Sequence, residues 1–291
     1  MKAIKNLIIS LVVIVTILGV AVIGGYIYVR STYGIDLFRT AEQLKILTED
    51  IDEASLCLNA YGEEDFVTMK SEIDKRFSGL IVYEKGKGYN GYSVNFASLA
   101  GKSMTDPIFL TEKHVGAIAQ TVFYEQTGGK IKIGEKEVSV TVMQVDFSEI
   151  AANGSADFNA VAKIDLTPFK ADMGGFPYKY FKKYIPDNLY ISSTVRVDKT
   201  EEDGFAYTVT HKSLTLNNLS ADDTAADLFD TLNAVLKIGT AENLNMQVGT
   251  MAVNSLIGTK DNPGFAYSMK AIGAKSFDFG TFSDIDLFVV Y

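Results

Sequence analysis

The hydrophobic residues of this chain form one long unbroken run near the N-terminus, several stretches with helical spacing, and several stretches that alternate with polar residues. The unbroken run, Leu7–Val29, holds 23 residues without a charge, and only Ser10 and Thr16 are polar. A helix of that length spans about 34 Å, which is enough to cross a hydrocarbon core of about 30 Å. Residues 7–29 are therefore predicted to form a transmembrane helix, with Tyr26 and Tyr28 at the membrane interface.

A cleaved signal peptide is the alternative interpretation of this run. The apolar region of a signal peptide is usually about 7–15 residues long and is followed by an A-x-A-like site, whereas this run is longer and no such site follows. Lys2 and Lys5 precede the run and Arg30 follows it, so the positive-inside rule places the N-terminus in the cytoplasm. The predicted order is a cytoplasmic N-terminus (1–6), the transmembrane helix (7–29), a tether (30–36) and one extracytoplasmic domain (37–291).

Apolar residues at helical spacing recur in five stretches of the predicted domain. The clearest is 63–77, where Phe66, Met69, Ile73 and Phe77 share one face, with acidic residues in the first turn and basic residues in the last. Helices are expected over about 36–54, 63–77, 111–126, 220–239 and 240–258. For the first two, the sequence leaves open whether they pack on a sheet or form a stalk.

Strand-like patterns occupy most of the rest of the domain. Asp203-Gly204 is typical of a hairpin turn and lies between two apolar-rich stretches, 191–197 and 205–216. Strands are expected over about 80–83, 92–96, most of 130–215, 264–272 and 276–290. These elements predict an α+β domain with a large, mainly antiparallel sheet and about five helices. No Pro/Ser/Gly-rich linker divides it, so one domain is expected.

Charge and cysteine usage exclude several classes of function. Residues 1–30 hold three of the 27 basic residues and none of the 36 acidic ones, so the rest of the chain carries a formal charge of −12. Such an acidic body is repelled by phosphate backbones, which argues against nucleic-acid binding. The single Cys57 excludes an intramolecular disulfide. It is predicted to be a buried, unactivated thiol, because the nearest charges in sequence are acidic.

Short motifs that resemble ligand-binding signatures lack the surrounding secondary structure that those signatures require. Residues 86–91 spell G-x-G-x-x-G, but a strand-like pattern follows at Tyr92–Phe96, where a dinucleotide site needs a helix. A hairpin turn is predicted there instead. His114 and His211, the two histidines, are each predicted to be surface or half-buried side chains rather than metal ligands or bases. No catalytic residue, metal site or cofactor is predicted.

One segment, residues 176–186, is a basic island in the acidic body. It interleaves aromatic rings with lysines, an arrangement that can lie at a membrane interface. The candidate ligand- or membrane-contacting residues are Phe176, Tyr178, Lys179, Tyr180, Phe181, Lys182, Lys183 and Tyr184. The alternative is a short amphipathic piece that packs Phe181 and Ile185 into the core and exposes its lysines to water.

Several stretches carry a resemblance to known proteins. The anchor followed by YGIDLFRTAEQLKILTEDIDE, then FPYKYFKKYIPDNLYISSTV, HKSLTLNNLS and GTAENLN, resembles a set of single-pass envelope proteins of low-GC Gram-positive bacteria. The resemblance spans most of the chain, and it implies a location in the cell envelope without implying an activity.

A more distant resemblance is to the YpmS-like, TULIP-type ectodomains. It rests on FLTEKHVGAI at 109–118 and on AKIDLTPFK at 162–170, with long strands between them. It implies a curved antiparallel sheet that wraps a helix and leaves an apolar groove, often for lipid. No ligand-binding residue can be carried over from it.

These observations favour a non-enzymatic, membrane-anchored protein that binds a lipid or other apolar ligand beside the membrane. This hypothesis predicts a concave apolar cavity of several hundred Å³, and a solidly packed sheet would contradict it. The alternative is a structural or interaction module of an envelope complex, which predicts an exposed apolar patch or an open sheet edge. A hydrolase or transferase with a site built from scattered residues is the third hypothesis. The predicted partners are the membrane, through residues 7–29, an amphiphile and an envelope protein.

Overall fold

The computed structural model describes residues 8–9, 13, 37–133, 136–171, 183, 185–200, 204–220 and 241–291. The predicted transmembrane helix and tether lie almost wholly outside this part, as does the helix expected over 220–239, except for Ser220. Among the described residues, none of the helices has both the length and the apolar character needed to cross a membrane.

The domain is α+β, and all of its described strand pairs are antiparallel, as predicted. The largest sheet has six strands in the order β4-β5-β6-β7-β8-β9. Their bounds are β4 Lys130–Ile133, β5 Lys136–Ser148, β6 Ala156–Asp165, β7 Asn188–Lys199, β8 Tyr207–Leu216 and β9 Leu219–Ser220. The pairing register shifts between Val142 and Gln144 of β5 and between Thr194 and Val195 of β7. Such bulges increase the local twist of a sheet.

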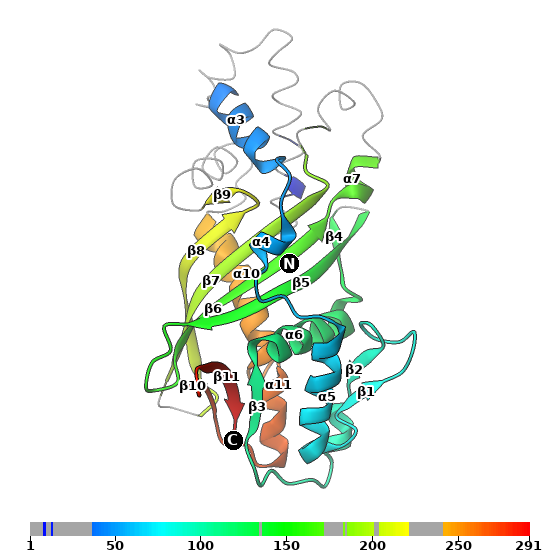
Figure 1. The fold of residues 1–291 in the computed structure, drawn as a ribbon, viewed down its shortest axis with the longest axis vertical. Helices are drawn as coiled ribbons and strands as arrows, with labels where there is room; N and C mark the ends of the chain where they lie inside the picture. The colour runs from blue at the N-terminus through cyan, green and yellow to red at the C-terminus, as the bar shows by residue number, and fades with distance from the viewer. Residues whose placement is uncertain are drawn as a thin grey trace.

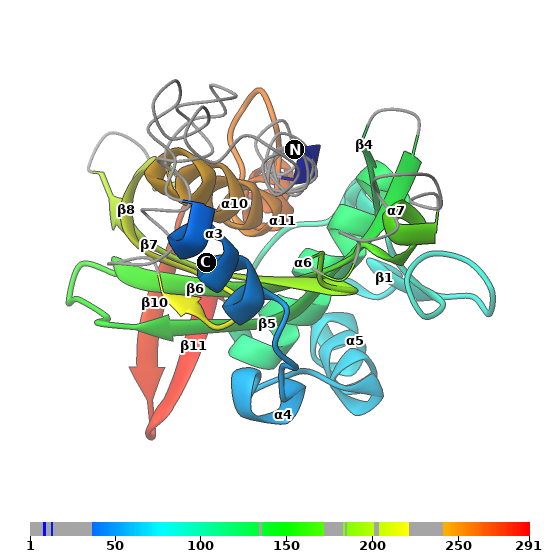
Figure 2. The same cartoon turned by 90° about the horizontal axis from the view of Figure 1, so that it is seen from above.

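The two faces of this sheet differ in polarity. Side chains such as Phe158, Ala160 and Val195 lie buried on one face, against helices α6 (Glu112–Thr127) and α10 (Ala241–Leu256). The opposite face carries polar side chains and is crossed by the segment around α4 (Glu53–Leu56). Figure 2 shows α10 and α4 on opposite sides of the sheet. Alternation of this kind is expected of an antiparallel sheet with one solvated face.

A second layer lies at the end of the molecule opposite α3 (Figure 1). Its three-stranded sheet has the order β10-β11-β3, and buried aromatic side chains, among them Phe147, Phe279 and Phe288, pack between this sheet and the larger one. The other elements are α3 Leu37–Leu47, α5 Glu63–Phe77, β1 Ile81–Tyr83, β2 Tyr92–Val94, η1 Phe96–Leu99, β3 Ile108–Thr111, α7 Thr167–Ala171, α11 Phe265–Ser268, η4 Met269–Ile272, β10 Phe277–Phe282 and β11 Ile285–Val290.

Several predicted elements are confirmed. Helix α5 buries the predicted stripe of Phe66, Met69, Ile73 and Phe77, and it packs on α6 and β3. This stretch therefore packs on the body and is not a stalk. Helix α6 begins where predicted, with Thr111 Oγ1 accepting a hydrogen bond from the His114 N–H at 3.3 Å. Strands β1 and β2 and helix α10 also match their predicted ranges.

The single helix predicted over 36–54 is wrong, because the chain forms two helices, α3 and α4. Asp52 is the N-cap of α4, and its carboxylate accepts hydrogen bonds from the Ala54 N–H at 3.1 Å and the Ser55 hydroxyl at 2.6 Å. An aspartate in that position favours a new helix start over continuation of an existing helix.

The C-terminal predictions also need correction. The strand predicted over 264–272 is wrong, because that stretch forms α11 and η4. Its buried residues include Phe265, Ala266, Met269 and Ile272, a spacing that puts them on one helical face. The single strand expected over 276–290 is a hairpin of β10 and β11, which turns at Ser283–Asp284, where both residues have positive φ.

Candidate ligand-binding clefts

An apolar cleft lies between η1 and the short helices α11 and η4. Figure 1 shows α11 at the end of the molecule opposite α3. The volume of the cleft is about 620 Å³, and small-molecule sites usually have volumes of about 300–1,000 Å³. Its lining is mainly apolar and includes Phe96, Leu99, Pro263, Tyr267, Lys270 and Ala271. Its volume and apolar lining match the apolar-ligand hypothesis, but it is an open surface cleft and not the enclosed concave cavity that the hypothesis predicts.

Local backbone contacts hold the two walls of this apolar cleft together. The N–H of Met104, in the loop after η1, donates to the carbonyl of Ile272 at the end of η4 at 2.7 Å. The loop between α10 and α11 folds back tightly at Gly264. A Cβ atom there would lie 2.2 Å from the carbonyl oxygen of Asn254, so glycine is needed for this close approach.

Lys270 supplies the charge of the cleft lining. Its Nζ lies 5.2 Å from the ring centre of Tyr267 and 5.7 Å from that of Phe205, within the range of cation–π contacts. The side chain is exposed. A cation beside an apolar cleft is suited to a ligand that joins an apolar part to an anionic group.

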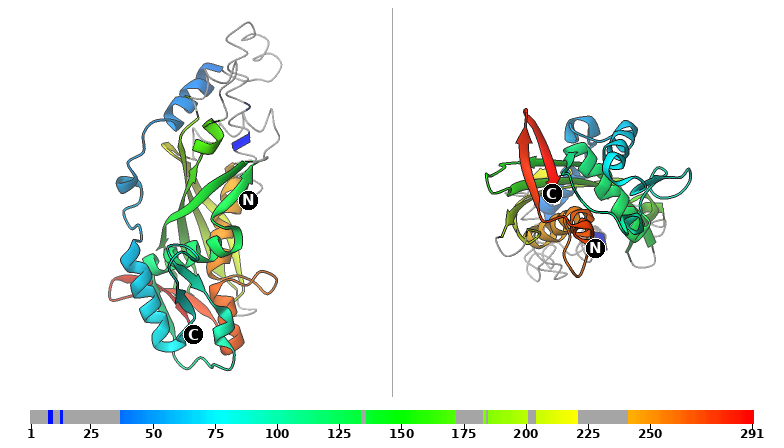
Figure 3. Two further views of the ribbon diagram at one scale, coloured as in Figure 1. Left: turned by 90° about the vertical axis from the view of Figure 1, so that its right-hand side faces the viewer. Right: turned by 90° about the horizontal axis from the view of Figure 1, so that it is seen from below.

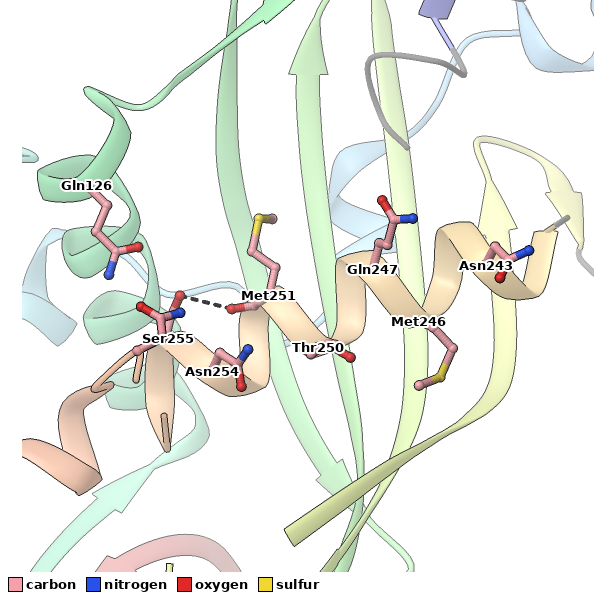
Figure 4. A pocket seen from close by; sticks show the side chains of 9 residues that line it. Gln126, Asn243, Met246, Gln247, Thr250, Met251, Asn254 and Ser255 are labelled. Carbon is pink, nitrogen blue, oxygen red and sulfur yellow. Dashed lines mark hydrogen bonds between the residues drawn. The ribbon is translucent and has the colours of Figure 1, made fainter. Parts of the chain in front are cut away.

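A second cleft runs along the outward side of α10 and differs in chemistry (Figure 4). Its volume is about 460 Å³, and its described lining contains amide side chains but no charged side chain. Figure 4 shows Gln126 of α6 beside Ser255 and Asn254 of α10, with Gln247 further along the helix. The Ser255 hydroxyl donates to the carbonyl of Met251 at 3.0 Å. This surface can hydrogen-bond a polar ligand but is less suited to an apolar one.

The space between the six-stranded sheet and its covering helices is filled. An apolar cavity of about 30 Å³ remains there, between Phe123, Val142, Val248 and Met251. That volume corresponds to about one water molecule. The wide groove between sheet and helix that a TULIP-type resemblance implies is thus not open at this place among the described residues.

A polar cluster on the other face of the sheet joins α6, β5 and the segment after α4. The Asn59 Nδ2 donates to Oε2 of Glu112 at 2.7 Å and to Oδ1 of Asp146 at 3.1 Å. The Phe147 N–H donates to Oε1 of Glu112 at 2.5 Å. Burial raises the pKa of Glu112, and the nearby Asp146 raises it further, while the hydrogen bond from Phe147 opposes the rise. The described residues contain no group of His, Cys, Asp and Glu side chains that could hold a metal ion.

Cys57 lies close to a second polar contact on this face. Glu53 pairs with Lys163 at 2.5 Å and accepts a hydrogen bond from the Tyr190 hydroxyl. The hydrogen bond from Lys163 is the main cause that lowers the pKa of Glu53. Burial raises the pKa of the Cys57 thiol to about 11, with a contribution from Glu53. The prediction of a buried, unactivated thiol is confirmed.

Most of the predicted membrane-interface segment lies outside the described residues, namely Phe176, Tyr178, Lys179, Tyr180, Phe181, Lys182 and Tyr184. Lys183 is described; its side chain is exposed and lines a polar cleft of about 320 Å³ together with Lys170 and Asp187. Ile185 is buried, as the alternative interpretation of this segment predicts. The interface function of the segment stays a prediction.

Both histidines are partly buried, as predicted, and each lies within hydrogen-bond distance of a neighbouring side chain. His114 Nε2 lies 3.1 Å from the Thr68 hydroxyl oxygen, and burial lowers the pKa of His114. His211 Nδ1 lies 2.7 Å from Nδ2 of Asn245, a buried side chain that also accepts a hydrogen bond from Ser193 at 2.6 Å. Both contacts tie a helix to a neighbouring element.

The G-x-G-x-x-G stretch, residues 86–91, lies in the loop of the β1–β2 hairpin, which confirms the predicted turn.

Sequence reasoning did not find the apolar cleft. Its two walls are more than 150 positions apart in the chain, and no motif marks either of them. The only feature of the sequence that pointed to this region was the Asn262-Pro263-Gly264 turn, which ends one helix before the next begins.

Comparisons with protein-family models, with curated proteins and with solved structures found no match to this chain.

Proposed function

We propose that this protein is a membrane-anchored, extracytoplasmic binding protein that holds an anionic amphiphile, such as a lipid, without converting it. The observation that carries the proposal is the apolar cleft of about 620 Å³ with Lys270 in its lining. The apolar part of the ligand would contact Phe96, Leu99 and Tyr267, and its anionic group would lie at the lysine. Binding is favoured over catalysis because the Ser268 hydroxyl, the nucleophile in the described lining, donates its proton to the Gly264 carbonyl at 2.8 Å.

The membrane anchor and the cytoplasmic position of the N-terminus are inferred from the sequence. The uncharged run over residues 7–29 supports a transmembrane helix, and Lys2 and Lys5 before it support a cytoplasmic N-terminus. The apolar cleft lies at the end of the domain opposite α3, the helix that follows the predicted tether (Figure 1). With this anchoring, the ligand is held at the membrane-distal end of the domain, and not beside the membrane as the hypothesis from the sequence has it.

The proposal is tested by filling the apolar cleft. Ala271 lines it and is exposed, so Ala271→Trp blocks the cleft without replacing a core residue. Ala54→Trp is the matched control, because Ala54 is an exposed alanine on α4, on a different element from the cleft. Each 291-residue protein is purified from membranes in mild detergent, and the bound compounds are extracted and measured by mass spectrometry.

We expect about one anionic amphiphile per chain in the parent protein and in the Ala54→Trp variant, and at least a tenfold loss in the Ala271→Trp variant. Equal amphiphile content in all three proteins would show that binding does not depend on the cleft. Absence of an amphiphile from all three would reject the proposal.

A second candidate function, an interaction module of an envelope complex, is supported by a different surface. Large apolar side chains are exposed on the three-stranded sheet, among them Phe282 and Ile285. These residues do not belong to the cleft lining. The two functions are therefore compatible in one molecule.

A further inference from the structure

The cleft on the outward side of α10, which we call the amide-lined cleft, lies where this helix meets α6. The left-hand view of Figure 3 shows α10 running along the six-stranded sheet and reaching α6 near its C-terminal end. The volume of the cleft is about 460 Å³, within the range of about 300–1,000 Å³ that is usual for small-molecule sites. Its lining comes from α6, from α10 and, with Asn262, from the loop after α10.

The side chains that line the amide-lined cleft in the described part of the chain are all uncharged, and most of them are amides or hydroxyls. An ion that entered the cleft would lose hydration without meeting an opposite charge in this lining, which is costly. A wholly apolar ligand would instead cover amide groups and leave them without hydrogen bonds, which is also unfavourable. The lining therefore favours a neutral ligand that carries hydrogen-bonding groups of its own.

Two neighbouring side chains in the amide-lined cleft have hydrogen-bonding roles that are fixed by their other contacts. The hydroxyl of Tyr207 donates to Oδ1 of Asn254, so Nδ2 of Asn254 is available as a donor. The Ser255 hydroxyl, which is 7% exposed, donates its proton to the Met251 carbonyl at 3.0 Å, so its oxygen can only accept. Figure 4 shows Gln126 of α6 beside both residues. The cleft thus presents a donor next to an acceptor.

The hydroxyl groups of a carbohydrate match this arrangement, because each hydroxyl both donates and accepts hydrogen bonds. The thioether side chains of Met246 and Met251 line the same cleft, and their polarizable sulfur atoms suit contact with the C–H groups of a sugar ring. A peptide is matched less well. Bound peptides commonly pair with main-chain groups at a sheet edge, whereas α6 and α10 use their main-chain groups in helical hydrogen bonds.

We propose that the amide-lined cleft binds a neutral carbohydrate. One hydroxyl group of the sugar accepts a hydrogen bond from Nδ2 of Asn254, another donates to the oxygen of Ser255, and Gln126 contacts the same ligand from α6. The C–H groups of the sugar ring lie against Met246. The inference does not depend on the apolar cleft, because the two clefts share no residue of their described linings.

The test measures sugar binding to the 291-residue protein by saturation-transfer NMR titration, in a detergent without a sugar headgroup. The neutral probes are maltotriose, cellotriose, triacetylchitotriose and glucose. The charged probes are trigalacturonate and the glucosamine trimer, which is the deacetylated and cationic form of triacetylchitotriose. We expect at least one neutral trisaccharide to bind at least tenfold more tightly than either charged trisaccharide.

Four variants locate the binding site. Asn254→Asp keeps an acceptor for the Tyr207 hydroxyl but replaces the Nδ2 donor by a charged acceptor, so it should weaken binding at least tenfold. Thr250→Trp, at a half-buried position of the lining, fills the cleft and should cause a similar loss. Asn95→Asp makes the first change at an exposed asparagine of another element and should leave the affinity unchanged, as should Ala271→Trp in the apolar cleft. Circular dichroism checks the fold of each variant.

The proposal would be overturned if none of the neutral trisaccharides bound, if a charged trisaccharide bound as tightly as the neutral ones, or if neither Asn254→Asp nor Thr250→Trp lowered the affinity. Tighter binding of N-acetyl-triglycine amide, a neutral peptide, than of any trisaccharide would assign the cleft to a peptide and would also overturn it. Glucose that binds as tightly as the trisaccharides would support a free monosaccharide as the ligand, and at least tenfold weaker binding of glucose would support a segment of a glycan chain.

Discussion

The side-chain amide of Asn59 donates a hydrogen bond to the Glu112 carboxylate at 2.7 Å, although 53 positions separate the two residues. The same nitrogen reaches Asp146 of β5 at 3.1 Å. One amide thus joins the segment after α4, the first turn of α6 and the sheet. This contact holds the first turn of α6, a helix that packs against β5, α5 and α10.

Asn59→Ala is predicted to destabilise the protein by about 1–3 kcal/mol, because it leaves two partly buried carboxylates without a shared donor. Asn95→Ala is the control, since Asn95 is exposed and its side chain makes no capping hydrogen bond. The measurement is urea denaturation of both variants followed by circular dichroism. Equal unfolding midpoints for the two variants would contradict the role of Asn59.

Ionisation of Glu112 should contribute to the pH dependence of the unfolding free energy. Its pKa is raised in the folded state, mainly by burial. A carboxyl group whose folded pKa lies above its unfolded value contributes stability at low pH, and this is lost as the pH rises through the folded pKa. Glu53, whose pKa is lowered chiefly by the hydrogen bond from Lys163, contributes with the opposite sign and loses its stability as the pH falls.

The parent protein is predicted to lose stability as the pH rises above the ordinary glutamate pKa, because Glu112 must then ionise in a buried site. Glu112→Gln is predicted to lack this loss. The difference in unfolding free energy between Glu112→Gln and the parent protein should become more favourable to the variant as the pH rises from about 4 to about 8. Glu64→Gln, at an exposed glutamate in the first turn of α5, is the control. A pH-independent difference for Glu112→Gln would show that the raised pKa has no effect on stability.

Helix α10 approaches β7 closely at Gly249. A Cβ atom there would lie 2.3 Å from Cγ1 of Val195. Gly249→Ala should thus destabilise the protein by about 1–3 kcal/mol through overpacking, although alanine favours helices by about 1 kcal/mol over glycine. Gly280→Ala, where a Cβ meets open space, should be nearly neutral. Thermal unfolding of both variants checks this, and a stabilised Gly249→Ala protein would rule out the close approach.

Cys57 is predicted to react slowly with alkylating reagents in the folded protein. Its thiol is 6% exposed and has a pKa of about 11, so the thiolate fraction is more than about 100-fold below that of a free cysteine. Iodoacetamide labelling near pH 7.5, measured by intact-mass spectrometry, should be at least 100-fold slower in buffer than in denaturant. Comparable rates in the two conditions would contradict the burial of Cys57.

The helices that could be located from the sequence are those whose apolar spacing, terminal charges and capping residue all lie within the helix itself. Helix α5 combines an apolar stripe with matching charges at both ends, and α6 has a threonine cap, so both could be located from the sequence. Strand β3 was missed because it is only four residues long and pairs with β11, which lies more than 170 positions later. The buried residues of 264–272 form a helical face, but the short apolar run resembled a strand.

The exposed apolar face of the three-stranded sheet, which carries Phe109, Phe282 and Ile285, could not be recognised from the sequence. Residues of β11 that face outward, such as Ile285 and Val289, are as apolar as the inward-facing Phe288 and Val290. Such a pattern normally indicates a strand covered on both faces. Only the arrangement in space shows that one face is covered and the other is open. The apolar cleft was hidden for a related reason, because η1 and α11 meet only in the folded chain.

The apolar cleft is proposed to hold an amphiphile in the cell envelope. Its most direct test places a photo-crosslinking amino acid at Ala271 in the 291-residue chain, irradiates intact membranes, and identifies the adducts by mass spectrometry, with the same amino acid at Ala54 as the control. We expect an anionic amphiphile crosslinked at position 271 and at least tenfold less of it at position 54. Absence of that adduct from the folded protein, or equal amounts at both positions, would contradict it.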